Sequence, residues 1–429
     1  MSGFFLIAAQ SASADDLLEI YQLALEKDAQ FQSAQASYLA TKEAKPQARS
    51  FLLPQINASA GLSRTAQTVD RDTGDQNSDF DTKQYGINLN QVIFNRELFI
   101  GLDQADLSIA QAEAELEFAR QELIVRVAQA YFDVLSAEDT LRFTIGEKKA
   151  IGRQLEQAQK RFEVGLIAIT DVKEAQANYD GAVASEITAR NDIDIARNAL
   201  SVILGQFFGE LDKLTDRMLL LSPEPADADQ WMNKALEENL QLIATRLATE
   251  NAGLEIKRQR AGHYPTLDLN ASADQTNISG GFFGARDTGQ LSAGVALKLP
   301  IFQGTLVSSR TREAQYNFKQ AQEQFTQQRR TAAKLARDSY LNVIAGISSV
   351  QALKRAVESS QAAADATQAG FEVGTRTSVD VLISLRALFQ AERDYSVSRY
   401  AYLIDTLLLK AAVGTLTVDD LDKINRWLS

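Results

Sequence analysis

The sequence predicts an α+β membrane protein made of two copies of one unit, each combining long coiled-coil helices with a pair of amphipathic β-strands. Three observations predict this fold: a duplication, long proline-free stretches with a heptad pattern, and short segments of alternating apolar and polar residues. FEVGLIAITDV at 162–172 returns as FEVGTRTSVDV at 371–381. Three further segments return in the same order about 210 residues later, and they lie at 24–34, 51–62 and 91–99. A period this long indicates duplication of a whole structural unit, with repeats at 15–222 and 226–429.

The first element along the chain is an expected signal peptide remnant at 1–14. Residues 4–9 form an apolar run, and Ala12-Ser13-Ala14 is an A-x-A cleavage site before Asp15. The basic segment that normally precedes such a run is missing. The mature chain is expected to begin near Asp15 and to leave the cytoplasm. An irregular apolar N-terminus is the alternative.

Four amphipathic strands are expected, at about 54–68, 83–94, 265–277 and 289–302. In the first strand Ile56, Ala58, Ala60 and Leu62 alternate with polar residues. This length and period are typical of transmembrane barrel strands, although a half-buried soluble sheet alternates in the same way. Four strands cannot close a barrel, and open edges cannot face lipid. The chain is therefore expected to form an oligomer. Two chains would give eight strands with an interior filled by side chains, and three would give twelve strands with room for a lumen, which suits a pore.

Very long helices are expected at about 98–163, 168–204, 305–372 and 377–413. Proline is absent between Pro54 and Pro223 and after Pro300, so nothing in these stretches breaks a helix. Apolar residues recur at steps of three and four, which is the heptad spacing of coiled coils, with Glu186 as one exception. The first helix would be ~100 Å long at ~1.5 Å per residue. The alternative is an ordinary helical bundle, whose helices have about 10–20 residues.

The composition excludes several classes of site. The 429 residues include no cysteine and one histidine, His263. The chain therefore has no residue for thiolate chemistry and too few histidines for a histidine-based metal site. We expect His263 to lie at a turn between a helix and a strand. The 56 acidic residues exceed the 44 Lys and Arg, and a net charge of −12 disfavours nucleic-acid binding. A hydrolase is also disfavoured, because no G-x-S-x-G or P-loop pattern occurs. We therefore expect no enzyme activity, no cofactor and no metal site.

The repeated order of strand pair, long helices and tip motif resembles the TolC family of bacterial outer-membrane channels. The segments that carry the resemblance are RFEVGLIAITDVKEAQANYD at 161–180, GFEVGTRTSVDV at 370–381, LLPQ at 52–55 and LPIFQG at 299–304. The resemblance extends from about Asp15 to Ser429. Lipid-anchored, drug-specific members of the family carry a cysteine after the signal peptide, and this chain has none.

The resemblance implies a homotrimer in the outer membrane of a Gram-negative bacterium, extending into the periplasm. A 12-stranded trimeric β-barrel would cross the lipid bilayer, and a long α-helical coiled-coil barrel would cross the periplasm. Lateral helices from 15–45, 200–262 and 415–429 would form a belt around this helical barrel. The implied partners are a periplasmic adaptor (membrane fusion) protein and an inner-membrane RND or ABC transporter.

The resemblance also implies adaptor-docking tips and a gate. The tip residues would be Val164, Gly165, Leu166, Val373, Gly374 and Thr375, with the two glycines forming the turns. Asp380 matches an aspartate that rings the closed entrance and attracts cations. Arg376 and Thr170 match residues that tie neighbouring subunits shut. Asp171 matches a residue that ties a helix pair together within one subunit. Capping of the following helix is the structural alternative for both aspartates.

Two positions depart from the family pattern. The second aspartate ring, three residues after the first, is replaced by Ile383, which predicts a weaker cation trap beside an apolar constriction. The tyrosine that would pair with Asp171 is replaced by Phe371. The phenylalanine ring has no hydroxyl, so this latch is expected to be lost or replaced.

The predicted function is a passive exit duct of tripartite efflux pumps, type I protein secretion systems or both, gated at its periplasmic end. The alternative is a non-conducting, trimeric tether or adhesin stalk that spans the periplasm. The amphipathic strands and the paired tip motifs argue against this alternative. No motif names the exported cargo.

Overall fold

The computed structural model describes residues 15–70, 72, 74 and 76–429, so the expected signal peptide remnant lies outside the described residues. The chain forms two compact units. The first contains residues 15–36, 115–243 and 328–429, and the second contains residues 37–114 and 244–327. Each unit takes segments from both predicted repeats, so the repeats are interwoven. Their boundary near 222–226 stays a prediction.

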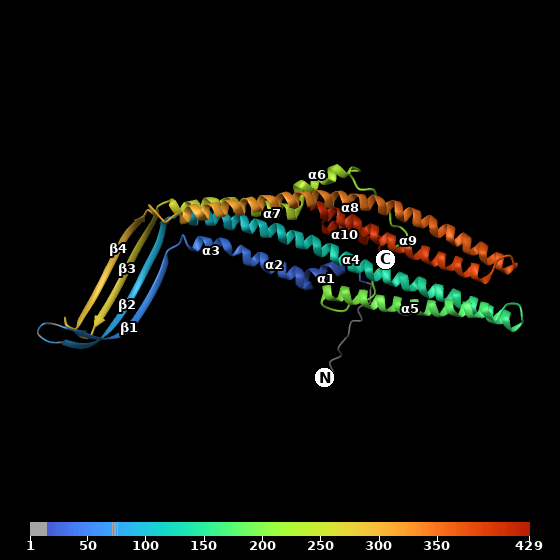
Figure 1. Ribbon diagram of the computed structural model, residues 1–429, viewed down its shortest axis with the longest axis horizontal. Helices are drawn as coiled ribbons and strands as arrows, with labels where there is room; N and C mark the ends of the chain where they lie inside the picture. Colours follow the sequence, from blue (N-terminus) through green and yellow to red (C-terminus); the bar gives the residue numbers. More distant parts are fainter. Residues whose placement is uncertain (1–14, 71, 73, 75) are drawn as a thin grey trace, which may run out of the picture. The chain divides into compact units, whose positions relative to one another are not determined.

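The second unit contains an antiparallel sheet with the strand order β1-β2-β3-β4 (Figure 1). Its strands are β1 (Gln55–Val69), β2 (Gln76–Phe94), β3 (Thr266–Ile278) and β4 (Arg286–Lys298). Each repeat supplies one hairpin, and pairing between β2 and β3 joins the two hairpins. Within the chain, β1 and β4 are therefore the two edges of the sheet.

The register gives the sheet one apolar and one polar face. Residues directly opposite each other on paired strands share a face. One apolar row crosses all four strands and consists of Ala58, Ile87, Ala273 and Leu291. The adjacent row points to the other face and consists of Asn57, Asn88, Ser272 and Ser292. In these rows the alternation predicted from sequence is therefore aligned across all four strands.

Three strand boundaries differ from the sequence expectation by three residues or more. One is the start of β4, which lies at Arg286 rather than near 289. β2 begins at Gln76 rather than near 83, because residues 76–82 continue to pair with 63–69 of β1. These residues are largely polar, but main-chain hydrogen bonds form without apolar side chains. β4 ends at Lys298 rather than near 302, just before Pro300, which has no N–H to donate to a strand partner.

Four long helices dominate the chain. They are α4 (Arg96–Glu163), α5 (Ile169–Leu204), α8 (Leu306–Glu372) and α9 (Ser378–Val413). Their ends lie within two residues of the expected positions. The shorter helices are α1 (Leu17–Lys27), α2 (Ala29–Lys42), α3 (Ala44–Ser50), α6 (Ala228–Glu238), α7 (Leu240–Arg260), the 3-10 helix η1 (Ala261–His263) and α10 (Val418–Asn425). His263 thus lies between α7 and β3. In the part of the chain that is described, no helix has the length and apolar character needed to cross a membrane.

The core of the first unit packs the shorter helices against α4 and α9. Tyr131 and Phe132 of α4 are fully buried, and the Phe132 ring stacks on Tyr400 of α9 with 5.6 Å between centroids. Arg126 of α4 donates two hydrogen bonds to the Asp28 carboxylate, at 3.0 and 2.8 Å. Asp28 lies between α1 and α2, so this charged pair ties both helices to α4.

Glu186 breaks the heptad pattern of α5 because it is paired with two cations. Its carboxylate contacts the Lys148 ammonium of α4 and the Arg190 guanidinium of α5, the latter at 2.6 Å. The hydrogen bonds from Lys148 and Arg190 hold the pKa of Glu186 below its ordinary value. A carboxylate can occupy this apolar position because both charges that face it are opposite in sign.

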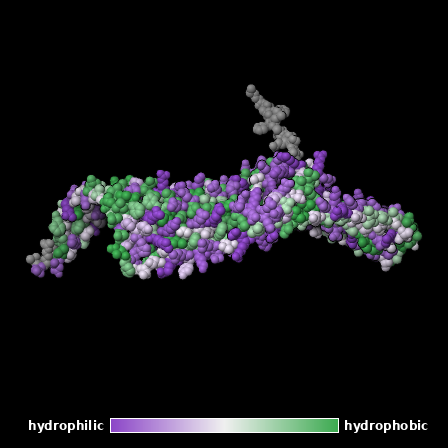
Figure 2. Space-filling view, turned by 90° about the horizontal axis from the view of Figure 1, so that it is seen from above, coloured by the Kyte–Doolittle hydropathy of each residue, from purple (hydrophilic) through white to green (hydrophobic). Residues whose placement is uncertain are grey.

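Exposed apolar side chains mark the place where the strands of the second unit begin. Figure 2 shows hydrophobic residues gathered on the surface where the sheet joins its helices. Phe51 and Leu53 precede β1, Tyr264 precedes β3, and each is about half exposed. Exposed apolar residues at this point are consistent with a sheet that continues into an apolar medium.

Candidate functional site

Two helical hairpins end in closely similar turns, one between α4 and α5 and the other between α8 and α9. The turn glycines have positive φ, +78° at Gly165 and +82° at Gly374. In each turn, the amide after the glycine donates to the carbonyl oxygen five residues earlier, at 2.8 Å. This is the Schellman motif, in which a left-handed residue closes the C-terminus of a helix.

The two turns expose apolar side chains. Val164 and Leu166 are 70% and 71% exposed, and Val373 is 76% exposed. The Thr375 hydroxyl donates to the Gly370 carbonyl at 3.0 Å, which reinforces the second turn. The six predicted tip residues therefore lie on two defined turns, and their apolar side chains are available for contact with another protein.

Asp380 is the acid of a capping box at the start of α9. Its amide donates to the Thr377 hydroxyl at 3.2 Å, and its carboxylate accepts from the Thr377 amide at 2.9 Å. The hydrogen bonds from the Thr377 amide and hydroxyl, and then the charge of Arg376, hold the pKa of Asp380 below its ordinary value. Within one chain, Asp380 thus caps the start of α9, which is the role expected of it if it has no part in a cation ring. Its carboxylate also stays accessible and ionised.

Asp171 holds the matching position in α5, but its surroundings differ. The N-cap residue of α5 is Ala168, which makes no side-chain bond to the helix, so α5 has no capping box. Asp171 still lies in the first turn, where the helix dipole favours a carboxylate. Its neighbour Thr170 is exposed. The capping alternative therefore accounts for Asp380 better than for Asp171.

Phe371, which replaces the expected tyrosine, makes a different contact between the hairpins. Its side chain is buried, and the guanidinium carbon of Arg161 lies 4.1 Å from the centroid of its ring. This is cation–π geometry, and it joins the end of α4 to the end of α8 without a hydroxyl group. Sequence reasoning missed Arg161. The available signal was its place directly before FEVG, where the second repeat has Gly370.

Gly370 is a second residue that sequence reasoning missed. Its carbonyl accepts from the amides of Thr375 at 2.8 Å and Arg376 at 3.2 Å. A Cβ at Gly370 would lie 2.8 Å from Cγ of Arg376. Glycine therefore lets the side chain of Arg376 fold back over the end of α8. The expected contact between Arg376 and Thr170 concerns neighbouring subunits and stays a prediction.

Ile383 lies one turn after Asp380 and is 62% exposed. The side chain that replaces the second acidic ring is thus accessible on α9. Its neighbours Val381 and Leu382 are buried instead. The Ile383 side chain is therefore available for contact outside the single chain.

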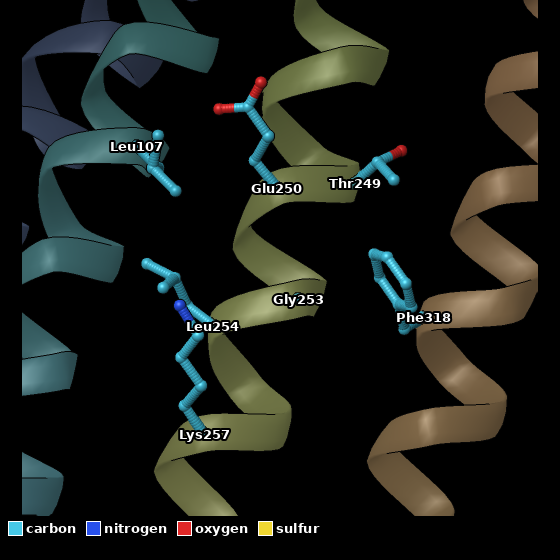
Figure 3. Close-up of a pocket in the computed structure, with 7 residues that line it drawn as sticks. All are labelled: Leu107, Thr249, Glu250, Gly253, Leu254, Lys257 and Phe318. Atoms are coloured by element: carbon cyan, nitrogen blue, oxygen red, sulfur yellow. The ribbon is translucent and has the colours of Figure 1, made fainter.

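Other parts of the described chain do not assemble a reactive site. The described residues contain no group of three or more His, Cys, Asp or Glu side chains placed to hold a metal ion. A shallow groove in the second unit is lined mainly by Leu107, Leu254 and Phe318, with Glu250 and Lys257 beside them (Figure 3). Thr249 also lines this groove, and its hydroxyl is engaged with the main-chain carbonyls of Thr245 and Ala321, at 2.9 and 3.3 Å. The two tips and the residues around Asp380 are therefore the candidate functional site.

Comparisons with known proteins extend over nearly the whole chain. Residues 20–206 and 231–415 match the family model described as outer membrane efflux protein. The chain is 38% identical over 425 residues to the outer membrane protein TolC of Vibrio cholerae, covering 97% of this chain and 94% of the relative. It is 28% identical over 432 residues to the alkaline protease secretion protein AprF of Pseudomonas aeruginosa, covering 98% and 89%.

A solved structure shares the fold. The outer membrane protein VceC of Vibrio cholerae has a TM-score of 0.78 to this chain at 20% identity, covering 93% of this chain and 96% of that one. The two matched stretches of the family model fall one in each predicted repeat. By these matches the chain belongs to the outer membrane efflux protein family, a family of transport channels rather than of enzymes.

Proposed function

We propose that three copies of this protein form a passive exit duct that is gated at its periplasmic end. As a member of its family, the protein is located in the outer membrane of a Gram-negative bacterium and extends into the periplasm. It serves there as an outer-membrane duct for efflux or type I secretion. The trimer, the docking tips and the gate go beyond this family assignment.

The two-faced sheet is the observation that carries the proposal. Its edge strands β1 and β4 have no partner within the part of the chain that is described, and unpaired main-chain groups cannot face lipid. Joining β4 of one copy to β1 of the next in three copies closes a barrel of twelve strands. The apolar face would then contact lipid, and the polar face would line the lumen.

Hydrogen bonds on the polar face support a hydrophilic lumen. The Asn90 amide group donates to the Asn270 side-chain oxygen at 2.7 Å, and the hydroxyls of Ser272 and Ser292 lie 2.9 Å apart. A face built from such groups suits a water-filled passage, because each polar side chain keeps partners in water. A tether without conduction has no need for this face.

The two tips are proposed to dock a periplasmic adaptor protein, which links the duct to an inner-membrane RND or ABC transporter. Val164, Leu166 and Val373 supply exposed apolar surface, and the two Schellman turns hold it in place. The name of AprF concerns secretion of a protease, and the name of the family model concerns efflux. The cargo of this chain is accordingly a small toxic compound, a secreted protein or both.

The gate is proposed to consist of Asp380, Arg376 and Thr170, with Asp171 and Ile383 beside them. In a trimer three Asp380 carboxylates would surround one axis, and each Arg376 would reach a neighbouring subunit. A charge-assisted contact of this kind contributes about 1.5–3 kcal/mol. Three symmetric contacts would hold the entrance closed until an adaptor competes for the tips.

Single-channel conductance in planar lipid bilayers tests the proposal. The wild type should insert and conduct with small, stable steps, and Arg376→Ser should conduct more because its entrance is less firmly closed. A protein that inserts as a trimer but never conducts would favour the tether. Equal conductance of the wild type and Arg376→Ser would retain the duct but place its gate elsewhere.

A further inference from the structure

We infer that exposed cations at the base of the sheet bind the phosphate headgroups of anionic phospholipids. These junction cations are Arg49, Lys257 and Arg260. The inference rests on the proposed function, because it requires the strands β1–β4 to face lipid. It adds a lipid-binding surface where the helices of the second unit lead into the strands.

Arg49 and Arg260 hold equivalent positions in the two repeats. Each lies in the last turn of a helix, α3 or α7, and five residues before a proline that precedes a strand. Exposed apolar residues directly precede the two prolines, Leu53 at 49% and Tyr264 at 54% exposure. Duplication has therefore placed a cation, an apolar side chain and an amphipathic strand in the same order at two points along the sheet.

No acidic side chain in the described part of the chain neutralises the junction cations, whereas two other cations on the same helices, α3 and α7, are paired. The Lys45 ammonium is 2.8 Å from the Asp106 carboxylate, and the Arg258 guanidinium is 2.7 Å from the Glu255 carboxylate. By contrast, Arg49, Lys257 and Arg260 are exposed and form no ion pair with any residue that the structure describes. In a chain with a net charge of −12, these unpaired cations can each attract an anion.

A hydrogen-bond network on α7 engages other residues and leaves Lys257 and Arg260 available to bind an anion. Gln104 of α4 donates to the side-chain oxygens of Asn251 and Glu255, both at 3.0 Å. Glu255 also accepts from Arg258 on the same helix. The network therefore engages Arg258, whereas Lys257 and Arg260 are left on the exposed surface of α7.

The position of these groups favours a lipid headgroup over a soluble anion. Arg49 precedes Ile56, the first residue on the apolar face of β1, by only seven positions. The headgroup region on each side of a bilayer is about 5–8 Å thick, and tyrosine and cationic side chains concentrate there. Basic residues beside a membrane attract anionic lipids. Along the chain, Arg49 and Arg260 thus lie a few residues before the points where the apolar faces of β1 and β3 begin.

The helix dipole offers a simpler explanation, because cations in the last turn of a helix stabilise it in any medium. The two explanations differ in their dependence on lipid. We would reconstitute the full-length protein in nanodiscs of phosphatidylcholine, with or without phosphatidylglycerol, and follow thermal unfolding by circular dichroism. The inference predicts that phosphatidylglycerol raises the Tm of the wild type and that 1 M salt removes most of this rise.

Variants locate the effect. Arg49→Gln/Arg260→Gln should lose at least half of the rise in Tm caused by phosphatidylglycerol, and Arg49→Lys/Arg260→Lys should keep most of it. The control Lys354→Gln/Arg355→Gln removes the same charge from exposed positions on α8 and should keep the whole rise. An equal rise in the wild type and Arg49→Gln/Arg260→Gln would overturn the inference. So would a Tm that is indifferent to phosphatidylglycerol.

Two further arms separate other sources of the signal. Inorganic phosphate added to phosphatidylcholine nanodiscs should not raise the Tm, and a rise equal to that caused by the lipid would identify a soluble-phosphate site and overturn the inference. Conductance in pure phosphatidylcholine bilayers should be the same for the wild type and Arg49→Gln/Arg260→Gln. A protein that cannot insert into phosphatidylcholine bilayers at all would contradict the proposed duct. The lipid-binding inference would fall with it, because that inference requires the strands to face lipid.

Discussion

At Gly374 the backbone φ is +82°, and beyond Gly374 and its two chain neighbours no described heavy atom lies within 4 Å of the place where a Cβ would stand. Gly165 in the first hairpin has the same properties, with φ at +78°. Lack of space is therefore not the reason for glycine at either turn. The reason is the left-handed backbone, which other residues adopt only at a cost of about 1 kcal/mol or more.

Gly374→Val is expected to abolish export while the trimer and barrel stay intact. A β-branched residue is strongly disfavoured at positive φ, so the turn should rearrange and displace the exposed tip. Gly374→Asn is the matched control, because asparagine enters the left-handed region more readily and should retain more export. Drug resistance or protein secretion in cells that lack their own channel provides the measurement. Normal export by Gly374→Val would show that docking does not depend on this turn.

Asp380 is expected to give a cation block that survives mild acid. Its folded pKa is lowered, so the ionised form stabilises the start of α9 above the ordinary aspartate pKa of about 3.9. That stabilisation is lost only as the pH falls through the lower folded value. In a trimer, repulsion among three Asp380 carboxylates would act in the opposite direction and raise their pKa. Block of conductance by a trivalent cation should be similar at pH 7 and pH 5 where the Thr377 hydrogen bonds outweigh this repulsion, and it should disappear in stronger acid.

Substitutions distinguish the cation ring from helix capping. Asp380→Asn should remove the block but keep α9, because the asparagine oxygen can still accept from the Thr377 amide. Ile383→Asp should strengthen the block by adding a second acidic ring. A block that does not change in Asp380→Asn would leave Asp380 with a capping role only.

At the scale of elements, the two hairpins are matched in outline but differ in their contacts. The second has a capping box made by Thr377 and Asp380, and the first has Ala168 at the N-cap. Arg161 and Phe371 join the ends of α4 and α8, and the Gln154 amide donates to Gln368 between the same helices at 3.3 Å. Rearrangement of one hairpin against the other must break these contacts.

Arg161→Gln is expected to raise the open probability of the channel, because it removes the charge that stacks on Phe371. Such a contact contributes about 0.5–2 kcal/mol, and a trimer would contain three of them. Arg161→Lys should give a smaller effect, since an ammonium keeps the charge but lacks the planar guanidinium. Arg153→Gln, an exposed position on the same helix, is the control. If single-channel recordings of Arg161→Gln and Arg153→Gln coincide, the contact does not hold the entrance.

At the scale of the whole molecule, one chain supplies four strands and cannot satisfy both edges of its sheet. The residues of the edge strands β1 and β4 are also largely exposed on both faces in the single chain. Lipid can cover the apolar face, but only another strand can pair with the main-chain groups of β1 and β4. Assembly is thus demanded by hydrogen bonding more than by burial of apolar surface.

The assembled protein is expected to be a trimer that resists mild detergent. Three copies give twelve strands, an even number within the range of bacterial barrels. Mass measurement in detergent and β content from circular dichroism should be made on the same sample. A stable monomer or dimer with full β content would contradict the twelve-stranded barrel.

The sequence by itself determined the local structure and the family. Proline placement, period-2 alternation and the heptad pattern depend on residues close in sequence. They predicted the four strands and four long helices with boundaries within four residues, except at the start of β2. The repeated FEVG segments predicted both turns for the same reason, since a left-handed glycine is a local requirement.

Only the tertiary structure decided which distant residues meet. Arg161 and Phe371 are far apart in the sequence, and no pattern links a cation in one repeat to a ring in the other. In the sequence Glu186 is an exception to the heptad pattern, and only the structure places Lys148 and Arg190 beside its carboxylate. The polar residues at the start of β2 are identified as a strand only by their pairing with β1. Ion pairs, cation–π contacts and strand pairing depend on which residues are close in three dimensions. Sequence periodicity indicates which residues share a face of one element, but not which residues of another element they contact.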